Sequence, residues 1–219
     1  MKTKIIKMEN NREKQVKTIE IAASIVKRDG VIVFPTETAY GLGADATSDA
    51  AVKKVFELKV RPPEKGIPVI VSDLFMIKEY ASLSSIAEHL VKSFTPGPLT
   101  LVVDQREGKF PRELSQSGIA FRVPGNDFLR ALVSGCETPL TSTSANISGE
   151  PPLYKIDEVI KLFDGKVDLI LDQGNLPPIF PSTIIDVRGE PKLLRKGPID
   201  EKEVFAEIER FNSSLRKMP

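Results

Sequence analysis

The feature that most constrains the fold is an alternation of short apolar runs with segments of helical periodicity. The apolar runs occupy residues 31–34, 67–71, 99–103, 119–123, 167–171, 182–187 and 191–194. Apolar residues recur at helical spacing in 13–29, 48–59, 73–80, 84–93, 126–134, 155–163 and 200–211. Short apolar strands between helices are typical of an α/β fold with a largely buried sheet. Because the last runs lie close together and can pair in antiparallel fashion, we predict a mixed parallel and antiparallel sheet.

The first helical segment illustrates the pattern. Val16, Ile19, Ala23 and Val26 fall on one helical face, and Gly30 is expected to end the helix. The chain shows no internal repeat and no low-complexity linker. We therefore predict a single domain over 1–219, with a core at about 15–200 and a closing helix at 200–211.

Composition excludes several classes of protein. The 31 Lys and Arg residues nearly balance 30 Asp and Glu, which disfavours a protein that lives on nucleic acid. A single cysteine excludes an internal disulfide or a cysteine zinc cluster and fits a reducing compartment. The first residues are too polar for a signal peptide, and no apolar run reaches bilayer-spanning length. We therefore expect a soluble, cytoplasmic protein with no membrane partner.

Polar, small and basic residues gather where the predicted strands and helices end. In FPTETAYGLG, residues 34–43, a buried strand stops at a proline and is followed by hydroxyls, a carboxylate and two glycines. Comparable segments lie at 59–62, 122–125, 141–149, 181–183 and 195–197. Each one alone is an ordinary turn composition. Since loops at strand ends can converge in α/β sheets, six such segments together predict a binding site.

The residue types in these segments point to an anion. They include three arginines, one lysine and several hydroxyls: Arg61, Arg122, Arg195, Lys59, Thr36, Ser142, Ser144 and Ser182. Guanidinium groups suit carboxylates and phosphates, and hydroxyls complete an anion cradle. Neither standard glycine-rich phosphate loop is present, and no histidine pair or cysteine cluster could hold zinc. The set favours a nucleotide with a small carboxylate beside it. With no activated nucleophile, catalysis would rest on positioning and charge stabilisation.

Taken together, these segments resemble a known family. PTETAYGLG, KVRP, PGPLTLVV, FRVP, TSTSANISGEPP, PSTIIDV and LLRKGPI occur in the order seen in threonylcarbamoyl-AMP synthases, the YrdC-like enzymes. The resemblance covers roughly residues 15–200 and implies a twisted α/β sheet with a large concave groove. It also implies a reaction in which L-threonine, bicarbonate or CO2, and ATP give threonylcarbamoyl-adenylate and pyrophosphate with Mg²⁺. A transferase of the universal tRNA-modification family would then pass the group to adenosine 37 of tRNAs that read codons beginning with A.

The resemblance also implies roles for individual residues. The threonine and carbamate end would be formed by Thr36, Tyr40, Arg122, Ser142 and Ser182. Nucleotide contacts would come from Lys59, Arg61, Ser144, Asn146 and Arg195, with Lys59 and Arg61 also catalytic. No metal ligand is assigned, because the ATP phosphates would hold most of the Mg²⁺. Gly41 and Gly43 would let the backbone approach the ligand closely.

The chain departs from the family pattern in three places. Thr143 stands where a proline often precedes Ser-Ala-Asn, Pro152-Leu153 replaces small hydroxyl residues, and the loop after Arg61 offers Lys65 instead of an asparagine. These departures bear on the finer nucleotide contacts. Longer relatives add a C-terminal domain, and we expect this chain to end before one.

Other polar residues have simpler interpretations. His89, the single histidine, fits a helix surface, and Cys136 fits a packed thiol. Asp45 and Asp49 fit capping of the helix that begins after Ser48. Three roles remain open for Glu37: binding Mg²⁺, ordering its loop or capping the glycine turn.

Two alternative functions remain. The groove could bind RNA without chemistry, with a basic interior inside a neutral total charge; tRNA binding is otherwise expected to be weak. The chain could instead be a detached relative of the carbamoyl-transfer domain of hydrogenase maturation proteins. Those domains work beside cysteine-rich zinc segments, which a single cysteine excludes here.

Overall fold

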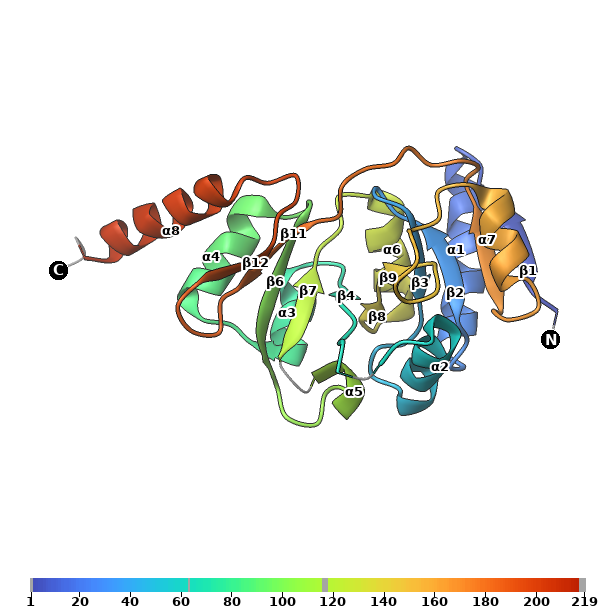
Figure 1. The fold of residues 1–219 in the computed structure, drawn as a ribbon, viewed down its shortest axis with the longest axis horizontal. Helices are drawn as coiled ribbons and strands as arrows, with labels where there is room; N and C mark the ends of the chain where they lie inside the picture. Colours follow the sequence, from blue (N-terminus) through green and yellow to red (C-terminus); the bar gives the residue numbers. More distant parts are fainter. Residues whose placement is uncertain (1, 63, 116–117, 217–219) are drawn as a thin grey trace.

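The fold is a pair of mixed β-sheets flanked by helices (Figure 1). The computed structural model describes residues 2–62, 64–115 and 118–216. The helices are α1 Arg12–Val26, α2 Asp49–Lys59, α3 Leu74–Tyr80, α4 Ser85–Phe94, α5 Arg112–Ser115, α6 Asp127–Cys136, α7 Ile156–Phe163 and α8 Glu201–Leu215. None of these helices is both long and apolar enough to cross a membrane.

The first sheet has five strands in the order β1-β10-β2-β3-β9. Its strands are β1 Lys4–Lys7, β2 Ile32–Pro35, β3 Tyr40–Gly43, β9 Thr143–Ser144 and β10 Leu169–Asp172. β1, β10 and β2 are parallel, whereas β2, β3 and β9 pair antiparallel.

The second sheet has seven strands, six of them in the order β12-β11-β6-β7-β4-β8, with β5 pairing at the side of β6. Its strands are β4 Val69–Ile70, β5 Ala81–Ser82, β6 Leu99–Gln105, β7 Ile119–Arg122, β8 Leu140–Thr141, β11 Thr183–Asp186 and β12 Lys192–Arg195. β8 and β9 follow each other along the chain, so residues 140–144 connect the two sheets. The predicted mixture of parallel and antiparallel pairing is confirmed in both sheets.

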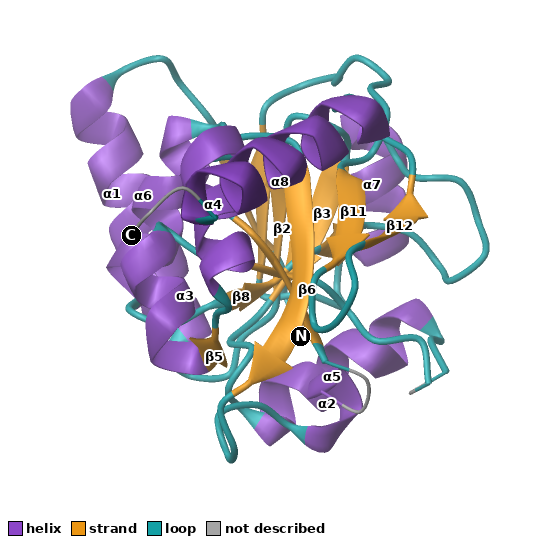
Figure 2. Cartoon of the chain, turned by 90° about the vertical axis from the view of Figure 1, so that its left-hand side faces the viewer, coloured by secondary structure: helices purple, strands orange, loops and turns teal. Residues whose placement is uncertain are grey.

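Helices cover the sheets from outside (Figure 2). One buried cluster packs α1 and α6 against the first sheet and includes Ala22, Val26, Phe34, Leu132 and Leu171. A larger cluster contains residues of α2, α4, α7 and α8. Most helices begin at a polar residue whose side chain accepts a backbone N–H, as the sequence predicted for Ser48. The other such caps are Asn11, Asp73, Ser84, Asn126 and Asp200.

The structure corrects the sequence interpretation at several elements. The sequence predicted no strand at β1, β3, β5 or β9 and no helix at α5. The run 67–71 keeps a strand only at Val69–Ile70. Val16 is 48% exposed, because the buried face of α1 is instead formed by Thr18, Ala22, Ala23 and Val26.

The first helix also ends earlier than predicted, at Val26. Asp29 adopts a left-handed conformation with φ 58°, and Gly30 N–H donates to Ile25 O at 3.0 Å. The closing helix is longer than predicted and runs from Glu201 to Leu215.

Candidate functional site

A cavity of about 540 Å³ lies where the segments highlighted by the sequence converge. Its walls include Thr36 and residues 38–41 of the segment from β2 to β3, Gly118, Ala120 and Arg122 in and before β7, and residues between 181 and 195 around β11 and β12. Eight of the ten predicted site residues line it: Thr36, Tyr40, Arg61, Arg122, Ser142, Ser144, Ser182 and Arg195. Lys59 and Asn146 do not line it, although they hold the wall in place.

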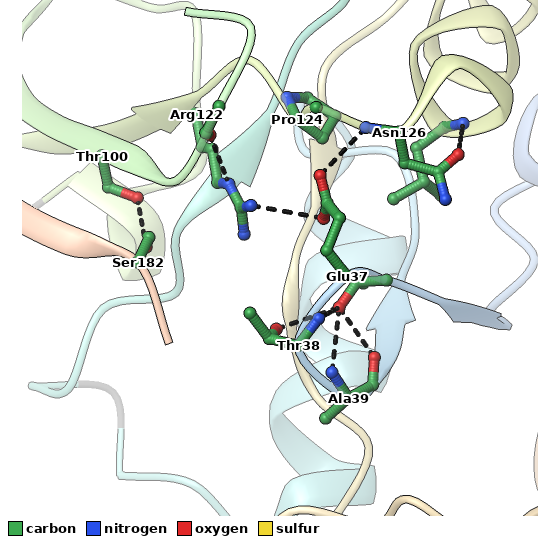
Figure 3. A network of polar contacts seen from close by, with 12 residues as sticks. Glu37, Thr38, Ala39, Thr100, Arg122, Pro124, Asn126 and Ser182 are labelled. Atoms are coloured by element: carbon green, nitrogen blue, oxygen red, sulfur yellow. Dashed lines mark hydrogen bonds and ion pairs between the residues drawn. The ribbon is translucent and has the colours of Figure 1, made fainter. Parts of the chain in front are cut away.

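Arg122 ends β7, and its side chain is only 12% exposed. Its Nε donates to Gly97 O at 3.0 Å, and its Nη2 donates to Glu37 Oε2 at 3.2 Å (Figure 3). Burial lowers the pKa of Arg122, and the nearby Glu37 carboxylate opposes that shift. The guanidinium is therefore fixed on two sides and still borders the cavity.

Arg195 approaches the same wall from β12. Its Nε donates to Ser182 O at 3.0 Å, and its Nη2 donates to Ser182 Oγ at 3.1 Å. The Ser182 hydroxyl also contacts Thr100 Oγ1 at 2.7 Å (Figure 3). Burial, and then repulsion from Arg122, lowers the pKa of Arg195. Two like charges beside one cavity favour an anion between them.

Arg61 follows α2 and also lines the cavity. Its Nε donates to Lys65 O at 2.5 Å, and its Nη2 donates to Gly66 O at 2.9 Å. Burial lowers the pKa of Arg61. Over the described ranges 2–62, 64–115 and 118–216, no carboxylate forms an ion pair with Arg61 or Arg195. A guanidinium that is half-buried without a counter-ion is poised to bind one from outside.

The hydroxyls divide into those that shape the loop and those that remain available. Thr36 Oγ1 donates to Ala39 O at 2.7 Å and accepts the N–H groups of Thr38 and Ala39, which closes the turn between β2 and β3. The Ser142 hydroxyl lines the cavity and has no hydrogen-bond partner within the described part of the chain. Ser142 is thus the freer of the two toward a ligand.

Tyr40 forms part of the wall, but its hydroxyl is already used. It donates to Gly174 O at 2.6 Å and accepts the N–H of Gln173 at 3.1 Å. Burial raises the pKa of Tyr40 to about 12. Tyr40 therefore anchors the segment after β10 and presents other atoms to the cavity.

Lys59, at the last position of α2, is 1% exposed. Its Nζ donates to Ser144 O at 2.6 Å, Asn146 O at 3.0 Å and Asn146 Oδ1 at 2.7 Å. The side chain of Asn146 also accepts from Ser144 Oγ at 2.7 Å and donates to Glu150 O. Burial lowers the pKa of Lys59 to about 8, while the three acceptors favour its charged form. These contacts fix the loop from which Ser144 reaches the cavity.

The residues that depart from the family pattern also lie at or near this site. Thr143 and Pro152 line the cavity, whereas Lys65 contributes its carbonyl to Arg61. Sequence reasoning missed Thr100 and Thr38, which line the same space. Thr100 sits inside an apolar strand, and only the inward alternation of LTLVV could have indicated it.

The remaining polar residues have structural contacts. His89 Nε2 lies 2.7 Å from Glu207 Oε1, and its ring stacks on Phe211, so His89 joins α4 to α8. Cys136 is buried, which raises the pKa of its thiol to about 12. Asp45 Oδ1 accepts from Thr47 and from Thr138 Oγ1, so Asp45 does not cap α2.

Fold and site together define a class of protein: an α/β protein with a guanidinium-lined cavity, suited to an anionic ligand, between two mixed sheets. The sequence model of the Sua5/YciO/YrdC family, described as "Telomere recombination", matches residues 24–197. The chain therefore belongs to this family, and the resemblance seen in its sequence is confirmed.

Relatives within the family carry informative names. A putative threonylcarbamoyl-AMP synthase of Methanocaldococcus jannaschii is 34% identical over 91% of this chain and 95% of that protein. A threonylcarbamoyl-AMP synthase of Pyrococcus abyssi is 38% identical over 87% of this chain, which spans 58% of the Pyrococcus protein. A crystal structure of P. abyssi Sua5 complexed with L-threonine matches with a TM-score of 0.84 and 33% identity, covering 95% of this chain and 61% of that one.

Proposed function

We propose that this protein is an L-threonylcarbamoyladenylate synthase, which makes threonylcarbamoyl-AMP and pyrophosphate from L-threonine, bicarbonate or CO2, and ATP. The observation that carries the proposal is the cavity lined by four arginines. Arg122 and Arg188 pair with Glu37 and Asp186, whereas Arg61 and Arg195 have no carboxylate partner over the described residues. Because guanidinium groups suit carboxylates and phosphates, arginines without a carboxylate partner beside one cavity favour anionic substrates. The names of the family relatives specify which anions to test.

The threonine end is assigned to the wall around Arg122. Its guanidinium can bind the amino-acid carboxylate, while Ser142 and Ser182 offer hydroxyls to the amine, the carbamate or the side chain. Because the sequence predicts no activated nucleophile, we propose that the substrate provides its own. The threonine amine adds to CO2 to form a carbamate, and a carbamate oxygen then attacks the α-phosphorus of ATP as pyrophosphate leaves.

The nucleotide end is assigned to Arg61, Ser144 and Arg195, with Lys59 and Asn146 holding the Ser144 loop. Positive charge on both sides of the triphosphate would allow an anionic carbamate to approach it. Arg61 and Lys59 are the residues we expect to affect the rate most.

We propose that Mg²⁺ binds together with ATP. The described residues contain no group of three or more His, Cys, Asp or Glu side chains that could hold a metal ion. An ion held by phosphate oxygens is the usual arrangement for Mg²⁺ with nucleotides. When bound, it would neutralise phosphate charge in concert with Arg61 and Arg195.

The product would be passed to a threonylcarbamoyl transferase that modifies adenosine 37 of tRNA. An adenylate is an activated acyl donor, so a second enzyme must consume it. We propose that this chain catalyses the reaction in the cytoplasm without tRNA and binds tRNA at most weakly.

A pyrophosphate-release assay tests the proposal. We expect release only when ATP, Mg²⁺, threonine and bicarbonate are all present, and no stimulation by tRNA. An RNA-binding module would retain tRNA without releasing pyrophosphate. A carbamoyl-transfer domain would require carbamoyl phosphate and ignore threonine.

A further inference from the structure

We propose that Glu37 is a positioning residue that holds Arg122 in the orientation needed to bind the substrate carboxylate. The inference rests on the proposed function, since it takes the bound carboxylate to be that of threonine. It also decides between the roles that the sequence left open for Glu37.

The contacts of Glu37 leave neither carboxylate oxygen idle. Oε2 accepts from Arg122 Nη2 at 3.2 Å, and Oε1 accepts from the backbone N–H of Asn126 at 2.9 Å (Figure 3). The side chain is 29% exposed, so water competes only in part with these bonds. The carboxylate therefore joins Arg122 to the first residue before α6.

The backbone of Glu37 is held as firmly as its side chain. Glu37 sits inside the turn that Thr36 Oγ1 closes by accepting the N–H groups of Thr38 and Ala39 (Figure 3). This turn joins β2 to β3, two strands whose residues are buried. A carboxylate on such a turn is preorganised and loses little freedom when it pairs.

Arg122 is left with a free binding edge by this arrangement. Its Nε–H donates to Gly97 O, and one of the two N–H groups of Nη2 donates to Glu37. The other three of its five N–H groups have no acceptor among the described residues. These remaining N–H groups can form the two parallel bonds that a ligand carboxylate accepts. Without Glu37, the guanidinium would keep a single anchor.

Glu37 also balances charge beside the cavity. Arg122 and Arg195 are close enough for their charges to repel. Glu37 compensates one of these two positive charges, which keeps Arg122 beside Arg195 before any ligand binds. Removing Glu37 would therefore free Arg122 to move away from Arg195.

The pair also connects the two sheets beside the cavity. Glu37 belongs to the β2–β3 turn of the five-stranded sheet, and Arg122 ends β7 of the seven-stranded sheet. A displacement of about 1 Å at a binding group can cost on the order of 10²-fold in rate. A contact that sets the separation of the two walls can thus control the chemistry without touching the reacting atoms.

A role as a magnesium ligand is disfavoured by the same contacts. Binding a metal would require Glu37 to give up Arg122 or Asn126, and the described residues offer no cluster of further ligands. The two roles predict different dependences, because only a ligand should change the Mg²⁺ requirement.

The test compares steady-state kinetics of the wild type with Glu37→Ala and Glu37→Gln. We expect Glu37→Ala to raise the threonine concentration for half-maximal rate by roughly 10- to 100-fold, and the ATP and Mg²⁺ requirements to change far less. The threonine requirement of Glu37→Gln should lie between those of the wild type and Glu37→Ala. Glutamine keeps one acceptor oxygen, whereas the two donors now use the two oxygens of the carboxylate. Calorimetric titration with threonine should show the same order.

The matched control is Glu13→Ala, which removes the exposed ion pair with Lys17 on α1 and should change nothing. Thermal melting checks folding, and Glu37→Gln carries the test if Glu37→Ala does not fold. Unchanged threonine dependence in both variants, or a raised Mg²⁺ requirement, overturns the positioning role while the proposed function stands. A wild type that neither binds nor uses threonine overturns the proposed function instead.

Discussion

Arg61 shows how backbone carbonyls can hold a cation ready for a ligand. Lys65 O and Gly66 O fix Nε and Nη2, so the rest of the guanidinium is free to meet phosphate oxygens. We expect Arg61→Ala to cost about 2–4 kcal/mol of transition-state stabilisation, measured as the loss in kcat/KM. Arg61→Lys should restore only part of this, because an ammonium cannot reproduce the forked geometry.

The control for Arg61 is Arg28→Ala, an exposed arginine beyond the end of α1. That variant should keep wild-type kinetics. Full activity in Arg61→Ala would remove Arg61 from the nucleotide end and leave Arg195 as the phosphate-binding cation.

At the scale of single residues, the site was predicted from the types of residue that follow predicted helices and strands. Arg61, Arg122 and Arg195 follow a helix or end a strand, and cations in such places converge in α/β folds. The sequence could not predict that Lys59 turns its Nζ away from the cavity, because that depends on how the loop of Asn146 folds over α2. The role of Glu37 was equally hidden, since its partner lies 85 residues away.

At the scale of elements, the glycines of the β2–β3 hairpin have a packing role in addition to the predicted close approach to a ligand. A Cβ at Gly43 would overlap the ring of Phe34 and lie 2.9 Å from Thr141 O. A Cβ at Gly41 would lie 3.0 Å from Phe34 Cε2 and 3.2 Å from Thr36 Cγ2. The buried Phe34 and the backbone at Thr141 therefore lie too close to these positions for a larger residue. Gly41 also lines the cavity.

This packing predicts two unequal alanine variants. Gly43→Ala should lower the free energy of unfolding by about 3 kcal/mol, because backbone as well as a ring must move. Gly41→Ala should cost about 1 kcal/mol, since only side-chain atoms must yield. Urea unfolding measures both, and equal effects would mean that the hairpin is looser than the structure has it.

The ends of α1 and α2 supply a second matched pair. Both helices end in the same pattern, with a residue at positive φ and a bond from the next N–H back five residues. In α2 that residue is Val60, which is 70% exposed with φ 50°; in α1 it is Asp29. A β-branched side chain is strained in this conformation, whereas aspartate tolerates it.

We therefore expect Val60→Gly to raise the free energy of unfolding by about 1 kcal/mol. Asp29→Gly should change it little. Denaturant midpoints measure both variants, and a loss of stability in Val60→Gly would contradict the strain at this helix end.

Elements were predictable from the sequence where periodicity is strong and local. The longer strands and all the helices except the four-residue α5 follow that rule. β1 does not, because Lys4–Lys7 is short, half polar and defined by pairing with β10 more than 160 residues away. β9 has only two residues and exists because β3 lies beside it.

For the whole molecule, the division into two sheets explains why the sequence could predict which segments form the site but not the geometry of the site. Arg122, Arg195 and Ser182 come from the seven-stranded sheet and its connections, and Thr36 and Tyr40 from the five-stranded one. Residues 140–144 are one of the segments that connect these sheets beside the cavity. The separation of the two walls, which sets what can bind, is a property of the tertiary structure.

The most direct test of the whole account is to identify the product. Purified protein would be incubated with ATP, Mg²⁺, threonine and ¹³C-bicarbonate, and the nucleotides analysed by mass spectrometry. We predict an adenylate that contains threonine and carries the ¹³C label, formed with one pyrophosphate and without tRNA. An adenylate of unmodified threonine, a label that requires carbamoyl phosphate, or no adenylate at all would contradict the account.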